Sequence, residues 1–371
     1  MEIIASKTTS NTNTQRRVST IHRHLVASIA DTTGKRAIVK KHALVSPPEG
    51  LSAIEIEPMS KPSVSNLKPF EMIIKVKAAS CNFPDLLQPS NQHNIKPKLP
   101  FVVGGEAAGD IVALGAEAAK TFQIGDRVMH WPASGGMQSW VVASSRWVFK
   151  IPKQLSYEQA AGLPLAYMTA YTALVYRGQL KANQSVLILG ATGGVGMAAT
   201  QMAKAIGCKV IAAGGTDAKL KVVQEEFGAD HVVNYTTTPR FRDVVKGFTN
   251  GKGVDMVYDP VSGDVLMESF KCCNYGAKIL IVGFVGAPVS EGVTGAPTHQ
   301  ILAKNLSVIG SGYDLFRRSV VRDGINAISK WVEEGKINPR VHAALPIEKV
   351  KDGLMMLWNR QVIGKVVVVP P

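Results

Sequence analysis

Cysteine is scarce in this chain, and the few thiols present lack paired spacing. The sequence contains four cysteines, Cys81, Cys208, Cys272 and Cys273, and no C-x-x-C pair. Four thiols without paired spacing predict neither a disulfide scaffold nor a zinc site. A disulfide-stabilised secreted module is therefore excluded, and a reducing intracellular compartment fits the composition best.

Long apolar runs are also missing. No stretch approaches the ~18–20 apolar residues that a helix needs to cross a bilayer, so no membrane span is predicted. Hydrophobic residues make up 46% of the chain and charged residues 19%, as in ordinary soluble proteins. With 371 residues, the chain is long enough for two domains with separate cores.

Acidic residues are in short supply. The 28 Asp and Glu residues face 42 Lys and Arg, which leaves a net charge of +14. Such a field favours anionic ligands, and phosphate-bearing cofactors are the first candidates. RNA is a weaker alternative, because the sequence has no dense basic run and no interleaving of basic with aromatic residues.

Residues 1–33 differ in composition from the rest of the chain. They are rich in Ser and Thr and poor in acidic residues. If residues 16–30 form a helix, apolar side chains share one face and basic ones the other. Two interpretations stay open, a mitochondrial transit segment or a disordered tail, so the predicted location is the cytoplasm or the mitochondrial matrix.

From Lys35 onward, short apolar segments alternate with Gly and Pro. Segments at this spacing predict strands of an antiparallel, barrel-like domain. The predicted strands are residues 36–40, 53–56, 72–76, 110–114, 127–130 and 139–142.

After Pro164 the pattern changes to strand, helix, strand. This alternation is typical of an α/β fold with a doubly wound parallel sheet and helices on both faces. The predicted strands are residues 185–189, 209–213, 231–233, 254–258, 278–282 and 306–310, with helices that include residues 195–206 and 321–333. A last strand is predicted at residues 365–369, and it could return to the first domain.

The sharpest motif follows the first of these strands. It reads Val186-Leu-Ile-Leu-Gly190-Ala191-Thr192-Gly193-Gly194-Val195-Gly196. Against G-x-G-x-x-G, the first position is Ala191, and Gly193 and Gly196 fill the second and third. Gly193 allows close approach of a pyrophosphate, Gly196 allows tight packing of helix on strand, and the helix N-terminus offers N–H groups to the phosphates. All seven residues from Gly190 to Gly196 are predicted to bind a dinucleotide.

The next strand points to the cofactor type. An NAD site places Asp or Glu at its end, on the ribose 2′-hydroxyl. Here the strand ends in Ala213-Gly214-Gly215-Thr216 without a carboxylate, and Lys219 follows. Asp217 lies beyond the strand end, where it is a candidate N-cap of the next helix. The missing acid and the nearby lysine predict NADPH.

Taken together, these motifs resemble the zinc-independent quinone oxidoreductases of the medium-chain dehydrogenase/reductase superfamily. Besides the glycine motif, the resemblance rests on segments that occur in the same order as in that family. They are Gly104-Gly-Glu-Ala-Ala-Gly109, Gly125-Asp-Arg-Val128, Ala161-Gly-Leu-Pro164 with Thr169-Ala-Tyr171, and Gly364-Lys-Val-Val367.

The resemblance implies a GroES-like β-barrel substrate domain split by a Rossmann cofactor domain. The implied limits are residues 34–163 and 311–371 for the first and residues 164–310 for the second. Family members are usually homodimers or homotetramers joined through the cofactor domains. The resemblance also assigns Gly215, Thr216, Lys219 and Tyr235 to the 2′-phosphate, and backbone groups around Gly283 and Phe284 to the nicotinamide amide.

Zinc alcohol dehydrogenases of this superfamily hold their metal with a Cys, a His and a second Cys. The matching positions here are Asn82, Gly105 and Leu165, which provide no thiolate or imidazole, so no catalytic zinc is predicted. A site without a Lewis acid suits hydride transfer to an acceptor that is already electrophilic, such as a quinone or a conjugated enone.

The catalytic candidates are Asn82, Asp85 and Thr169. The Asn82 amide is expected to donate to the substrate carbonyl oxygen as charge develops, although an asparagine after a strand is also a common turn former. Asp85 is expected to orient Asn82, and Thr169 to contact the nicotinamide ribose or ring. Glu106 is expected to hydrogen-bond within the barrel, and His130 to be a satisfied polar residue.

The predicted activity is NADPH-dependent reduction of quinones. The first alternative is reduction of enoyl thioesters or alkenals. The superfamily's mitochondrial enoyl reductases use a tyrosine after the Asn-x-x-Asp element, and residues 86–100 contain none. The second alternative is an RNA-binding or structural protein that retains the cofactor site. The sequence does not identify the acceptor, the number of electrons transferred at once or the oligomeric state.

Overall fold

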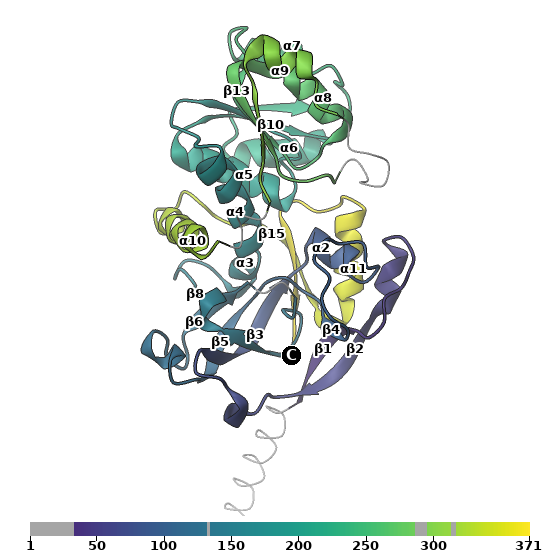
Figure 1. Ribbon diagram of the computed structural model, residues 1–371, viewed down its shortest axis with the longest axis vertical. Helices are drawn as coiled ribbons and strands as arrows, with labels where there is room; N and C mark the ends of the chain where they lie inside the picture. The colour runs from purple at the N-terminus through teal and green to yellow at the C-terminus, as the bar shows by residue number, and fades with distance from the viewer. Residues whose placement is uncertain (1–32, 132–133, 286–294, 313–316) are drawn as a thin grey trace, which may run out of the picture.

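The computed structural model describes residues 33–131, 134–285, 295–312 and 317–371, which form two lobes (Figure 1). The predicted N-terminal extension, residues 1–33, lies outside the described residues except for Thr33. Its interpretation as a transit segment or a tail therefore stays a prediction. Within the described ranges, no helix combines the length and the apolar character needed to cross a membrane.

The upper lobe of Figure 1 is built on a six-stranded parallel sheet, with the strand order β11-β10-β9-β12-β13-β14. Its strands read as continuous apolar runs because both faces are buried. In β9, Val186 and Ile188 face one apolar cluster, while Leu187 faces another. The strands are β9 (Ser185–Ile188), β10 (Lys209–Gly214), β11 (His231–Asn234), β12 (Val254–Asp259), β13 (Cys273–Ile281) and β14 (Ser307–Gly310).

Helices cover both faces of this sheet. On one face lie α4 (Pro164–Tyr171), its π-helical continuation η5 (Thr172–Arg177), α5 (Gly194–Ile206) and α6 (Asp217–Phe227). On the other face lie α7 (Arg242–Phe248), α8 (Gly263–Cys272) and α9 (Thr298–Lys304). The doubly wound sheet predicted from the sequence is confirmed.

The lower lobe contains a three-stranded sheet and a seven-stranded sheet. One has the order β2-β1-β4, and the other has the order β15-β16-β3-β5-β6-β8, with β7 paired to β3. The strands are β1 (Thr33–Val39), β2 (Ile54–Ser60), β3 (Glu71–Ser80), β4 (Phe101–Val102), β5 (Ala107–Leu114), β6 (Arg127–His130), β7 (Trp140–Ser144), β8 (Val148–Lys150), β15 (Val341–Pro346) and β16 (Lys365–Val369). The helices are α2 (Phe83–Leu87), α3 (Tyr157–Ala161) and α11 (Val350–Trp358). A further helix, α10 (Arg318–Glu333), lies at the side of the molecule and packs against α4 and η5 (Figure 1).

The barrel-like first domain is confirmed, and so is the return of the last strand. β16 pairs antiparallel with β3 and parallel with β15, and this parallel pair is the exception among otherwise antiparallel pairings in the lower lobe. β13 begins at Cys273, earlier than predicted, and it contains a register shift against β12 and a positive φ of 73° at Gly276. The domain limits at residues 163/164 and 310/311 stay a prediction.

β14 is an edge strand of the parallel sheet, with a neighbour on one side among the described strands. Three of its four residues are exposed, and Val308 is 40% exposed. An apolar edge of this kind presents unpaired backbone groups to other chains.

Candidate functional site

The glycine turn between β9 and α5 has the geometry of a phosphate cradle. Gly190 takes a φ of 59°, so the tight turn depends on Gly190. The next position, which is the first glycine position of the motif, can therefore be Ala191. A Cβ on Gly196 would lie 2.2 Å from the Gly190 oxygen, whereas one on Gly193 would have only that oxygen nearby, at 3.6 Å. Gly196 thus packs helix on strand, and Gly193 leaves open space for a ligand. The N–H groups in the first turn of α5 have no intrahelical partner and suit a pyrophosphate.

The same turn touches the last strand of the other lobe. Gly193 and Gly364 form a parallel β-bridge, and the Gly364 N–H donates to the Thr192 oxygen at 3.4 Å. Val195 is partly buried against the core below the turn. The predicted pyrophosphate site therefore lies directly against the start of β16.

The predicted 2′-phosphate residues come together at the end of β10. Thr216 is the N-cap of α6, and a Cβ on Gly215 would lie 3.5 Å from Cε2 of Tyr235. Burial raises the pKa of Tyr235, and the charge of Arg360 acts in the opposite direction. Arg360 is exposed, comes from the other lobe and is absent from the predicted set.

Lys219 is already hydrogen-bonded in this structure. Its ammonium donates to the backbone oxygens of Arg360 and of Val362, the latter at 3.2 Å, and burial lowers its pKa. It therefore ties α6 to the segment before β16, beside Tyr235. Asp217 is the first helical residue and accepts from Asn234 at 2.8 Å, so its assignment as the N-cap is wrong.

At the end of β13, Gly283 and Phe284 lie just beyond the strand. A Cβ on Gly283 would be 3.2 Å from the Pro260 oxygen, and Phe284 is 39% exposed. The neighbouring Asp259 is buried, and its Oδ1 accepts the N–H groups of the turn that follows it. Burial raises the pKa of Asp259 to about 6.

Asn82 is the N-cap of α2, as the turn-forming interpretation predicts, and its role toward the substrate stays a prediction. Its backbone N–H donates to Oδ2 of Asp85 at 2.8 Å, and the Gly104 N–H donates to Oδ1 of Asp85 at 3.2 Å. Asp85 is 1% exposed, and burial raises its pKa to about 7. Asp85 thus fixes the backbone of Asn82, while the side-chain amide points elsewhere.

The Asn82 amide belongs to a buried network of charges. Its Nδ2 donates to Oε1 of Glu106 at 2.9 Å and to the Ser80 oxygen at 3.3 Å, and its Oδ1 accepts from the Lys365 ammonium. Lys365 lies 3.1 Å from Oε1 of Glu106, and Oε2 of Glu106 accepts the Leu165 N–H at 2.8 Å. Glu106 therefore does more than hydrogen-bond within the barrel, because it links the barrel to α4 and to β16.

Thr169 joins this network through Leu165. Its hydroxyl donates to the Leu165 oxygen at 2.7 Å, one turn earlier in α4, and the side chain is partly exposed. With its proton committed to the helix, the Thr169 oxygen is left as an acceptor.

The positions that match the zinc ligands lie at this network. Asn82 and the Leu165 backbone both contact Glu106, and Gly105 precedes Glu106 in the chain. Among the described residues, no group of three or more His, Cys, Asp or Glu side chains is arranged to hold a metal ion. Independence from zinc stays a prediction.

Two site residues are missing from the set predicted from the sequence. Lys365 belongs to the Gly364-Lys-Val-Val367 motif, and its signal is a lone lysine directly before four valines. Arg360 carried no signal, because its place beside Tyr235 depends on the tertiary fold. His130 was expected to be satisfied, yet its buried Nδ1 has no partner within the described part of the chain.

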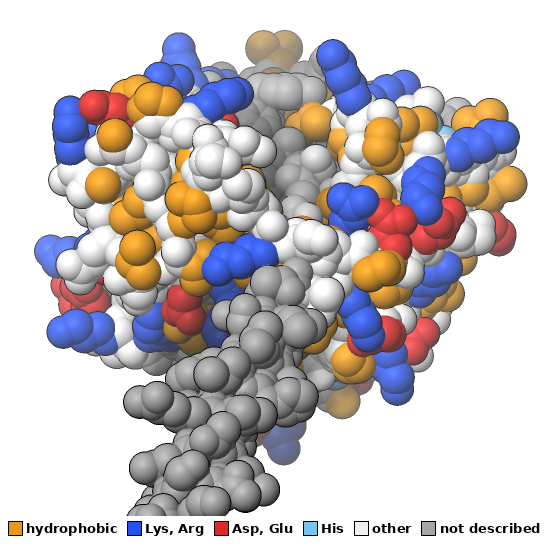
Figure 2. All heavy atoms as spheres, turned by 90° about the horizontal axis from the view of Figure 1, so that it is seen from below, with side chains coloured by type: hydrophobic (Ala, Val, Ile, Leu, Met, Phe, Trp, Pro, Cys, Tyr) orange, Lys and Arg blue, Asp and Glu red, His pale blue; other side chains and the backbone are white. Residues whose placement is uncertain are grey.

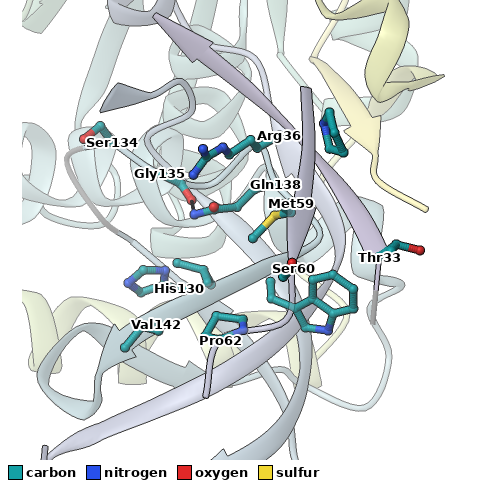
Figure 3. Close-up of a pocket in the computed structure, with 13 residues that line it drawn as sticks. Thr33, Arg36, Met59, Ser60, Pro62, His130, Ser134, Gly135, Gln138 and Val142 are labelled. Atoms are coloured by element: carbon teal, nitrogen blue, oxygen red, sulfur yellow. Dashed lines mark hydrogen bonds between the residues drawn. The ribbon is translucent and has the colours of Figure 1, made fainter. Parts of the chain in front are cut away.

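A cavity of about 840 Å³ lies elsewhere in the lower lobe, lined in part by Arg36, His130, Gln138 and Trp140 (Figure 3). None of the residues predicted to bind cofactor or substrate is among the described residues that line it. It is therefore separate from the network around Asn82.

Comparison with known proteins agrees with this architecture. The family described as "Alcohol dehydrogenase GroES-like domain" matches residues 68–153, and the one described as "Zinc-binding dehydrogenase" matches residues 194–330. The "Quinone oxidoreductase-like protein 2 homolog" of Nematostella vectensis is 32% identical over 312 residues, which cover 82% of this chain and 83% of the relative.

Solved structures share the whole fold. A probable oxidoreductase from Mycobacterium abscessus is 29% identical with a TM-score of 0.78, over 91% of this chain and 99% of that one. A mycobacterial protein solved in complex with NADPH also has a TM-score of 0.78, over 91% of this chain and 99% of that one, and at 24% identity it supports the fold alone. The chain therefore belongs to the medium-chain dehydrogenase/reductase superfamily of oxidoreductases, which use a nicotinamide cofactor, and within it to the quinone oxidoreductase-like family.

Proposed function

We propose that this protein is an NADPH-dependent reductase of quinones or closely related electrophilic carbonyl compounds. The observation that carries the proposal is the contact between the glycine turn and β16. Through the bridge between Gly193 and Gly364, this contact brings the pyrophosphate site next to the Asn82 network.

NADPH rather than NADH is favoured by the surroundings of Tyr235. The end of β10 has no carboxylate to bind a ribose 2′-hydroxyl. The charge of Arg360 acts on Tyr235, and the Lys219 ammonium contacts the Arg360 backbone oxygen. An anion with the charge of a 2′-phosphate offsets these charges.

When bound, the cofactor supplies the hydride. The first-turn N–H groups of α5 hold its pyrophosphate, and Asn82 orients the acceptor. Of the two hydrogen bonds that the Asn82 amide donates, the one to the Ser80 oxygen is longer, at 3.3 Å against 2.9 Å to Glu106. As the weaker of the two bonds, it leaves this N–H available to be shared with a carbonyl oxygen of the acceptor without rotation of the amide. A single oxyanion donor of this kind contributes about 10²–10³-fold to kcat.

Reduction of enoyl thioesters remains the alternative within the same fold, since a thioester carbonyl offers the same oxygen to Asn82. An RNA-binding role has less support. On the face seen in Figure 2, Lys and Arg side chains are dispersed over the surface and interleaved with acidic ones, without a continuous basic track.

The test follows the loss of NADPH absorbance in the presence of benzoquinone, phenanthrenequinone or an enoyl-CoA, with NADH as the control cofactor. Turnover of quinones with NADPH supports the proposal. Turnover of the enoyl-CoA alone assigns the protein to the alternative. Binding of NADPH without turnover of any acceptor contradicts both activities, and a salt-dependent shift of RNA would then favour the binding role.

A further inference from the structure

Lys365 is a buried lysine at the first position of β16, and it is 4% exposed. Its ammonium contacts Oδ1 of Asn82, Oε1 of Glu106 at 3.1 Å and the Cys81 oxygen at 3.5 Å. An ammonium only donates hydrogen bonds and a carboxylate only accepts them. The Asn82 amide between them therefore has one possible orientation, with its oxygen toward Lys365 and its N–H groups toward Glu106 and Ser80.

The aliphatic stem of Lys365 runs through a slot made by two glycines. A Cβ on Gly162 would lie 3.0 Å from Cγ of Lys365, and a Cβ on Gly194 would lie 2.9 Å from its Cδ. Gly194 is the first residue of α5 and part of the phosphate turn. The stem thus packs directly beneath the turn that receives the pyrophosphate, and its charged end reaches the Asn82 network.

A charge at this place also changes Asn82 as a donor. An ammonium on the amide oxygen draws electron density from the amide, and hydrogen bonds in such chains strengthen one another in a low-dielectric interior. The ammonium thereby makes the N–H that faces Ser80 a better donor to a developing oxyanion, and it offsets the opposite effect of the Glu106 carboxylate on the same amide. Glu106 balances the ammonium, because an unpaired buried charge would cost far more than the pair.

We infer that Lys365 is a positioning residue, which holds and polarises the Asn82 amide for catalysis and couples it to the phosphate turn. The inference rests on the proposed function, in which Asn82 contacts the acceptor. In this inference the effect of Lys365 on the reaction passes through Asn82, whose Oδ1 accepts from its ammonium.

The test is a double-mutant cycle on kcat. Lys365→Met keeps a stem of similar length and removes the ammonium, and Glu106→Gln is added to it so that no unpaired charge stays buried. We expect Lys365→Met/Glu106→Gln and Asn82→Ala each to lower kcat by about 10²–10³-fold, with NADPH affinity changed by less than about threefold. In the Asn82→Ala background, the Lys365→Met/Glu106→Gln pair should lower kcat by no more than about threefold further.

Two outcomes overturn the inference. If the charge-free pair has wild-type kcat, Lys365 and Glu106 serve stability alone. If it lowers kcat equally with and without Asn82, Lys365 does not act through the amide.

Gly162→Ala gives a graded probe, because its Cβ would crowd the Lys365 stem. Gly162 lies outside both the cofactor turn and the charge network. A kcat loss of a fewfold at unchanged NADPH affinity is expected, and an unchanged kcat would speak against the slot.

A second readout does not depend on turnover. In protein labelled with ¹⁵N-asparagine, the side-chain amide signals of Asn82 are those missing from Asn82→Ala. We expect them to shift clearly in Lys365→Met/Glu106→Gln, because both hydrogen-bonding partners change. Unmoved signals overturn the inference even if quinones are reduced. Shifted signals in a protein that reduces no acceptor leave the positioning intact and reject the proposed function instead.

Discussion

The burial of His130 leads us to expect a loss of stability on acidification, and this loss can be assigned to that one side chain. It lies in β6, opposite Ala107, and is 5% exposed, with no partner for Nδ1 in the described part of the chain. Burial lowers its pKa from 6.5 to about 3. Because the folded-state pKa is depressed, the stability that His130 contributes is present above pH 6.5 and is lost as the pH falls toward 3.

The magnitude follows from linkage. At pH 5 the unfolded chain has protonated His130 and the folded chain has not, which costs about 2 kcal/mol of unfolding free energy relative to pH 7.5. Urea unfolding of wild type and His130→Leu at both pH values measures this difference, with His299→Gln, at an exposed position, as the control. His130→Leu should lose about 2 kcal/mol less than wild type and His299→Gln. Equal losses in all three, or a His130 ring signal in NMR that titrates near its ordinary pKa, would refute the reasoning.

Three further predictions concern cofactor choice, Asp85 and assembly. Lys219→Ala should weaken NADPH binding by about 10- to 100-fold and NADH binding only slightly in fluorescence titrations, and equal losses would reject the 2′-phosphate assignment. Burial raises the folded-state pKa of Asp85 to about 7, against an ordinary value of 3.8. The stability that its protonated form contributes is therefore lost as the pH rises. Between pH 5 and 8, wild type should lose about 2–3 kcal/mol more unfolding free energy than Asp85→Asn, and parallel urea curves would contradict this. The β14 edge should pair with a second copy, so light scattering should give a dimer for wild type and a smaller species for Val308→Lys, whereas a wild-type monomer would contradict the pairing.

Much of the fold could be predicted because its signals are local. The apolar runs of the parallel sheet and the glycine turn after β9 depend on neighbours within about a dozen residues. The start of β13 could not be found in this way. It contains a shift of register against β12 and a positive φ at Gly276, and nothing in the alternation of apolar residues indicates either.

The candidate site was predicted less completely, for a related reason. Asn82 and Asp85 stand three residues apart, so their link through the N-cap is readable from the sequence. The partner of the Asn82 side chain, Lys365, is 283 residues away, and only the pairing of β16 with β3 brings it near. Arg360 and Lys219 meet through the same long-range packing.

The pairing of β16 with β3 also has a kinetic consequence. Val368 stands opposite Ala79, so this pair joins segments from opposite ends of the described chain. Contacts of such long range form slowly, because their loop-closure entropy is lost before the contact is made. Until β16 docks between β15 and β3, Glu106 lacks its counter-charge, so we expect this carboxylate to stay hydrated while the rest of the sheet forms. Recovery of activity on refolding would then lag behind recovery of secondary structure, and the lag would measure the docking of a single strand.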